Sequence, residues 1–160
     1  MWQDFIHALK DLSDAYAALL EIAGRKRAIL VAVDLKGLEP IVAEEEQQLE
    51  RIRAAEKRRQ DALLALSGEI PSTHAATTMA EVEAACPGDL RAALRVLHAR
   101  LNERVAAVKE AGEANEFLIR QALGAVEYHL NRIANSSIDP TYGQKGAETV
   151  SREKKFDFQA

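Results

Sequence analysis

Two long helical patterns in this sequence meet at residues 34–40, Asp34-Leu35-Lys36-Gly37-Leu38-Glu39-Pro40. Gly37 favours the left-handed end of a first helix, because glycine adopts positive φ without steric cost. Pro40 suits the first turn of a second helix that resumes at Leu38, where a missing N–H costs little. A break this short between two long helices predicts antiparallel packing as a helical hairpin.

Apolar residues recur at alternating spacings of three and four on both sides of this break, which is typical of a coiled-coil seam. A first helix is expected from Trp2 to Asp34, and only Lys26 interrupts its seam. The second seam continues to Leu66 but carries three polar residues, Glu45, Glu56 and Arg59. Glu56 and Arg59 lie three residues apart and can pair. We interpret the pair as an ionic contact that sets the register of a bundle, with a binding role as the alternative.

The second half of the chain begins with a capping box, Thr78-Met79-Ala80-Glu81, which predicts a short helix ending at Cys86. The turn Pro87-Gly88 follows, and Asp89 is a suitable N-cap for a last helix of some 45 residues, roughly 65–70 Å long at ~1.5 Å per residue. Its inner face is marked by Leu90, Leu94, Leu97, Leu101, Val105, Val108, Asn115, Ile119, Ala122, Val126, Leu130 and Ile133.

These patterns predict an all-α fold, an elongated antiparallel bundle of three long helices plus one short helix, with a flexible C-terminal tail. Only 5% of the 160 residues are aromatic, as expected for long amphipathic helices. After Ser136 the sequence becomes polar, glycine-containing and charged, which favours mobility when the chain is alone. We therefore expect a bundle domain over residues 1–135 and a tail over residues 136–160.

The sequence offers no constellation for catalysis, and we predict no catalytic, cofactor-binding or metal-binding residues. The four histidines are scattered, and no Glu-x-x-His motif of a di-iron bundle occurs. A net charge of −4 with interleaved signs argues against nucleic acid. No apolar run is long enough for membrane insertion. Cys86, the single cysteine, is expected to be buried in a soluble protein of the reducing cytoplasm.

Two motifs near the end of the chain carry a family resemblance. One is Asn115-Glu116-Phe117-Leu118-Ile119, which places an asparagine where the apolar seam should continue. The other is Pro140-Thr141-Tyr142-Gly143-Gln144-Lys145-Gly146, in which a tyrosine stands at a helix exit. Together with the Glu-x-x-Arg step at Glu56 and Arg59, their order along nearly the whole chain resembles the FlgN family of flagellar type III export chaperones.

The resemblance implies a function without catalysis. Members of the family bind the C-terminal helices of flagellar hook–filament junction proteins in the cytoplasm, prevent their premature assembly and deliver them to the export gate. It also implies that Tyr142, with Gly143 and Gly146, docks at the cytoplasmic domain of the gate protein FlhA. The residues expected to contact the client are Asn115, Leu118, Ile119, Ala122, Val126, Leu130, Ile133, Val150, Phe156 and Phe158.

Two questions stay open at this point. A buried asparagine such as Asn115 often fixes helix register, so it either holds the bundle or faces a client helix. The regular seams also allow a second function, a homo-oligomeric coiled-coil scaffold without a role in export. A client groove could itself be filled by a second copy of the chain, so self-association without client is compatible with either function.

Overall fold

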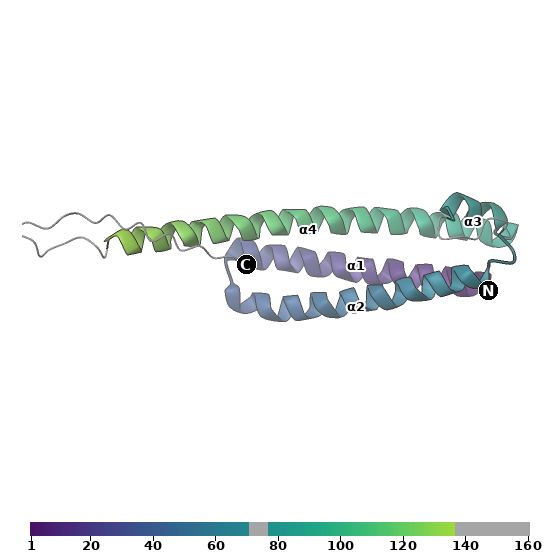
Figure 1. The fold of residues 1–160 in the computed structure, drawn as a ribbon, viewed down its shortest axis with the longest axis horizontal. Helices are drawn as coiled ribbons and strands as arrows, with labels where there is room; N and C mark the ends of the chain where they lie inside the picture. Colours follow the sequence, from purple (N-terminus) through teal and green to yellow (C-terminus); the bar gives the residue numbers. More distant parts are fainter. Residues whose placement is uncertain (71–76, 137–160) are drawn as a thin grey trace, which may run out of the picture. The chain divides into compact units, whose positions relative to one another are not determined.

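The computed structural model describes residues 1–70 and 77–136, and all regular structure in them is helical (Figure 1). The helices are α1 (Trp2–Ala32), α2 (Leu35–Ala65), α3 (Met79–Ala85) and α4 (Gly88–Ser136). This confirms the predicted all-α bundle of three long helices and one short helix. The chain divides into an N-terminal unit, residues 1–116, and a C-terminal unit, residues 117–160. The predicted boundary at residue 136 stays a prediction.

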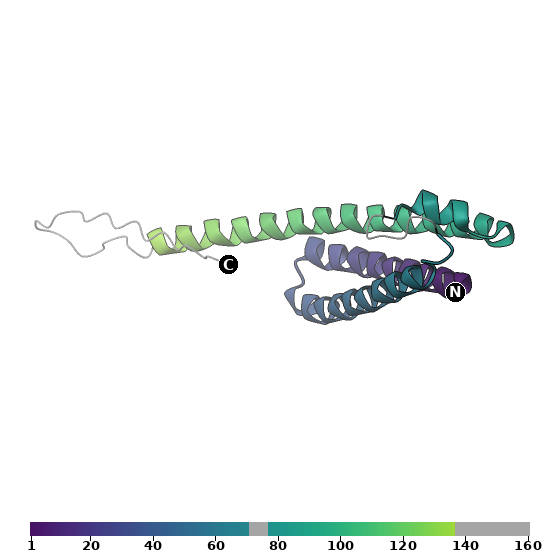
Figure 2. The same cartoon turned by 45° about the vertical axis from the view of Figure 1, so that its right-hand side comes forward.

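Helices α1 and α2 lie side by side as the predicted antiparallel hairpin (Figures 1 and 2). Their ion pairs show the direction: Lys26 bonds Glu45 at 2.6 Å, whereas Asp11, nearer the start of α1, meets Arg58, nearer the end of α2. Lys26 interrupts the apolar seam of α1, and Glu45 is one of the three polar residues in the seam of α2. Each interruption thus satisfies the other, because the ammonium and the carboxylate meet across the helix pair.

The turn between α1 and α2 corrects the expected roles of its residues. Val33, not Gly37, takes the left-handed conformation, with φ 55°. Asp34 is the N-cap of α2, and its Oδ1 accepts a hydrogen bond from the Gly37 backbone N–H at 3.2 Å. Consequently α2 begins at Leu35 rather than Leu38, and Pro40 lies inside the helix instead of in its first turn. The sequence signal for this cap was Asp34, a favoured N-cap residue, three residues before Gly37, which has no side chain to obstruct the cap.

The core of the N-terminal unit gathers where the start of α1, the end of α2, α3 and the start of α4 meet. Cys86 is buried as predicted, at 1% exposure. The Trp2 indole N–H donates to the Glu69 carboxylate, so the first turn of α1 is tied to the segment after α2. The buried side chains of this core are Trp2, Phe5, Leu9, Leu12, Ala55, Leu66, Ile70, Val82, Cys86, Leu94 and Leu101.

The start of α4 is fixed by its connection to α3. The predicted capping box is present, with the Thr78 and Glu81 side chains each bonded to the other's backbone N–H. The Arg91 guanidinium donates to the carbonyls of Ala84 and Cys86, which are exposed by the end of α3. Helix α4 begins at Gly88, so Asp89 lies in its first turn and is not the predicted N-cap.

Within the N-terminal unit, polar contacts join α4 to α1 at two levels, and at the first of them Arg104 also pairs with Asp14 at 3.2 Å. The Arg104 guanidinium donates to the backbone oxygen and the hydroxyl of Ser13, both at 2.8 Å. Further along, the Asn115 Nδ2 donates to the Ala23 carbonyl at 2.9 Å. The contacts at the two levels advance together along both helices. In this unit α4 therefore runs parallel to α1 and antiparallel to α2.

Candidate partner-binding site

The part of α4 in the C-terminal unit presents an aliphatic face, which we define as Ile119, Ala122, Val126, Leu130 and Ile133. Spacings of three and four place these side chains on one side of the helix. Ile119 is half-buried, but Val126 is 54% exposed, Leu130 46% and Ile133 63%. Leu118, also predicted to contact a client, is half-buried beside this face. Such a stripe is what an amphipathic helix offers to a partner.

An isolated helix of this length is marginal in water, because helix formation carries a costly nucleation step and gains little without packing. Residues 117–136 are nevertheless helical throughout, with their larger apolar side chains mostly open to solvent. Exposed apolar area of this kind favours covering by another molecule. The aliphatic face is therefore the strongest candidate site in the described part of the chain.

Asn115 stands four residues before Ile119 on the same side of α4, but it belongs to the N-terminal unit. Its side chain is 4% exposed and bonds α1 through the Ala23 carbonyl, while its Oδ1 is buried without a hydrogen-bond partner. This contact matches the register-fixing interpretation. Its predicted contact with a client stays a prediction.

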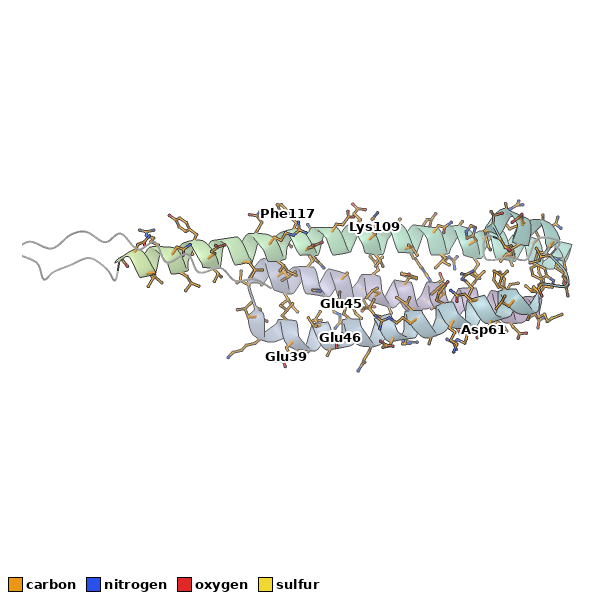
Figure 3. The ribbon with its side chains drawn as sticks, in the orientation of Figure 1. Glu39, Glu45, Glu46, Asp61, Lys109 and Phe117 are labelled. Atoms are coloured by element: carbon orange, nitrogen blue, oxygen red, sulfur yellow. The ribbon has the colours of Figure 1, made fainter. Side chains whose placement is uncertain are left out.

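Two exposed aromatic residues in the same segment were missed by the sequence analysis. Phe117 is 61% exposed and Tyr128 is 62% exposed, on the side of α4 opposite the aliphatic face. Figure 3 shows Phe117 pointing away from its helix into open space. The available signal was a second set of three–four spacings through Phe117, Gln121, Gly124 and Tyr128. The sequence analysis considered only the aliphatic seam and therefore did not identify this second set of residues.

The predicted pairing of Glu56 with Arg59 is confirmed. The Arg59 Nε and a terminal nitrogen donate to the two Glu56 oxygens at 2.9 and 2.6 Å. These hydrogen bonds lower the pKa of Glu56 and raise the pKa of Arg59. The pair borders a hollow of about 390 Å³, which is also lined by Phe5, Tyr16 and His98. Glu56 and Arg59 thus satisfy each other within α2, and the predicted role of the pair in setting the register of the bundle stays a prediction.

Among residues 1–70 and 77–136, no group of three or more potential metal ligands occurs. No helix in that part of the chain combines the length and the apolarity needed to cross a membrane. The predicted gate contacts Tyr142, Gly143 and Gly146 lie outside the described residues, as do the predicted client contacts Val150, Phe156 and Phe158.

Comparison with known protein families decides what kind of protein this is. The family model described as "FlgN protein" matches residues 1–149. The chain belongs to the FlgN family. FlgN proteins are flagellar export chaperones, so the resemblance drawn from the sequence motifs is confirmed. Searches of curated proteins and of solved structures found no match.

Proposed function

We propose that this protein is a cytoplasmic chaperone of flagellar type III export that binds the C-terminal helices of hook–filament junction proteins. The observation that carries the proposal is the exposed aliphatic face of α4 in a chain of the FlgN family. The client helix covers this face, and its own apolar stripe is withheld from premature assembly. The chaperone then delivers the complex to the export gate.

The physical basis is the burial of two apolar stripes against each other. Exposed apolar surface gains roughly 25 cal/mol for each Å² removed from water, so a helix-length contact offers useful affinity without any chemistry. The client segments are amphipathic helices whose stripes would otherwise meet each other. A chaperone helix with a matching stripe competes for that surface and holds it until export.

Delivery is assigned to the segment after α4. By family resemblance, Tyr142, Gly143 and Gly146 dock at the cytoplasmic domain of FlhA, and Val150, Phe156 and Phe158 add anchors for the client. Tyr142→Ala should weaken binding to that domain at least tenfold while leaving client affinity unchanged. A parallel loss of client affinity would contradict this division of labour.

The function is tested by titration calorimetry of the full chain against C-terminal helical peptides of the junction proteins from the same genome. We expect a stoichiometric complex with a large negative heat-capacity change, the signature of buried apolar surface. Absence of binding to every such peptide by a folded, helical sample would overturn the proposal.

A matched pair of variants locates the site. Val126→Ser removes an aliphatic side chain that is 54% exposed in the aliphatic face, and Val96→Ser removes one that is 59% exposed elsewhere on α4. The first should lower client affinity roughly tenfold, since a buried valine is worth about 1.5 kcal/mol or more. The second should leave the affinity unchanged. Equal losses in both variants would argue against the aliphatic face.

A further inference from the structure

The side of α4 opposite the aliphatic face has a pattern of its own, which we call the aromatic face. Its residues follow each other at spacings of four, three, four, three and four, so they form one continuous seam along the C-terminal unit. The two rings, Phe117 and Tyr128, are both more than 60% exposed. The members of the aromatic face are Phe117, Gln121, Gly124, Tyr128, Asn131 and Asn135.

This seam is complementary to itself when it is reversed. If two copies of α4 lie antiparallel about a two-fold axis level with Val126, Tyr128 of each copy faces Gly124 of the other. In the same register Gln121 faces Asn131, and Phe117 faces Asn135. A two-fold contact of this kind is isologous, because every pairing occurs twice.

The chemistry of each pairing supports that register. A Cβ added at Gly124 would meet no atom within 4 Å, so the backbone there is open to a ring. An aromatic side chain against a glycine brings two helices close together. Gln121 and Asn131 both carry a donor and an acceptor, so their amides can bond each other. The purely aliphatic stripe of a different helix would instead leave both amides without partners, at a cost.

We propose that the aromatic face of α4 pairs two copies of this chain in antiparallel orientation and leaves the aliphatic face of each copy free. Self-association and client binding then use opposite sides of one helix, so a dimer can carry a client on each subunit. The proposal does not depend on the identity of the client.

Sedimentation equilibrium of the full chain tests the pairing. The wild type should show a monomer–dimer equilibrium, and Tyr128→Ser should raise its dissociation constant roughly tenfold or more, because it removes two aromatic contacts from the symmetric dimer. Gly124→Leu should do the same by filling the space for the ring, although leucine favours the helix of the monomer. Val126→Ser, on the aliphatic face, is the matched control and should leave the equilibrium unchanged.

The charged residue beside the axis gives an effect of opposite sign. In the antiparallel register, Glu127 of one copy lies near Glu127 of the other, and like charges oppose association. Glu127→Gln should therefore lower the dissociation constant, most clearly at low salt. A wild type that stays monomeric at all concentrations would overturn the proposal. So would a dimer that is weakened by Val126→Ser but not by Gly124→Leu.

Cross-linking tests the direction. Oxidation of a mixture of Gln121→Cys and Asn131→Cys chains should give a disulfide-linked heterodimer, whereas neither variant alone should cross-link. Cys86 does not compete, because it is 1% exposed and burial raises the pKa of its thiol. Self-cross-linking of Gln121→Cys alone would indicate a parallel pair and exclude the proposed register.

Discussion

At the scale of single residues, Asn115 is a buried polar residue of α4 that bonds α1. Its Nδ2 bonds the Ala23 carbonyl, but its buried Oδ1 has no partner. A buried acceptor without a hydrogen bond costs roughly 1–3 kcal/mol, more than a typical hydrogen bond returns. The residue therefore stabilises one register of α4 on α1 at the expense of total stability.

We predict that Asn115→Leu raises the free energy of unfolding by about 1 kcal/mol, since it removes the unpaired acceptor and keeps the branched shape of the side chain. Asn115→Ala, which leaves a cavity, should not be stabilising. Urea denaturation followed by circular dichroism measures both. A clear loss of stability in Asn115→Leu would show that the amide is worth more than its visible contacts.

The pairing of Glu56 with Arg59 predicts a pH effect. Because the pKa of Glu56 is lowered in the folded chain, its contribution is present above the ordinary glutamate pKa of about 4.3 and is lost as the pH falls below it. Glu56→Gln should reduce the acid-induced loss of stability by a few tenths to about 1 kcal/mol. Glu50→Gln is the control, because Glu50 and Arg53 form a pair of the same spacing that is 70% exposed. Urea titrations at pH 7 and pH 3 compare the two, and equal effects would contradict a special role for Glu56.

At the scale of elements, the start of α2 depends on the Asp34 side chain, which occupies space that Gly37 leaves open. A Cβ added at Gly37 would lie 2.6 Å from Asp34 Oδ2, so a side chain at position 37 would force the capping carboxylate to move. Asp34→Ala should cost about 1 kcal/mol through loss of the cap. Gly37→Ala should destabilise the wild type but stabilise the Asp34→Ala background by up to about 1 kcal/mol, the helix preference of alanine. A double-mutant cycle measures this reversal, and simple additivity would exclude the coupling.

Which elements could be predicted from the sequence depended on whether short-range interactions determine them. The hairpin, the capping box and the long last helix followed from periodicity and local hydrogen bonding, so residues close in sequence sufficed. The conformation of the turn did not follow from these local patterns. Gly37 was expected to take the left-handed conformation, but Val33 takes it, next to the capping residue Asp34. The aliphatic face was predicted from spacing. Whether this face is exposed depends on which partners cover it, and the spacing of apolar residues does not predict those partners.

At the scale of the whole molecule, the buried side chains in the described part of the chain all lie between Trp2 and Asn115. A chain truncated to residues 1–116 should therefore unfold at nearly the same urea concentration as the full chain, with less total helix. It should also bind no client peptide, because the aliphatic face is gone. Circular dichroism and calorimetry test the two statements separately. A truncated chain that loses its cooperative transition would show that residues after 116 support the core.

The uneven distribution of the core along the hairpin has a consequence for motion. The main apolar cluster lies near the start of α1, whereas nearer the turn a smaller set of buried apolar residues (Leu19, Ile22, Ala23 and Ile41) stands beside the ion pairs of Arg25 with Glu44 and Lys26 with Glu45. Ion pairs are screened by salt, and apolar contacts are much less so. The hairpin should consequently fray from its turn, with amide hydrogens near Val33 exchanging first and faster as ionic strength rises. The end of the hairpin that holds Phe5 would remain protected until the entire unit unfolds.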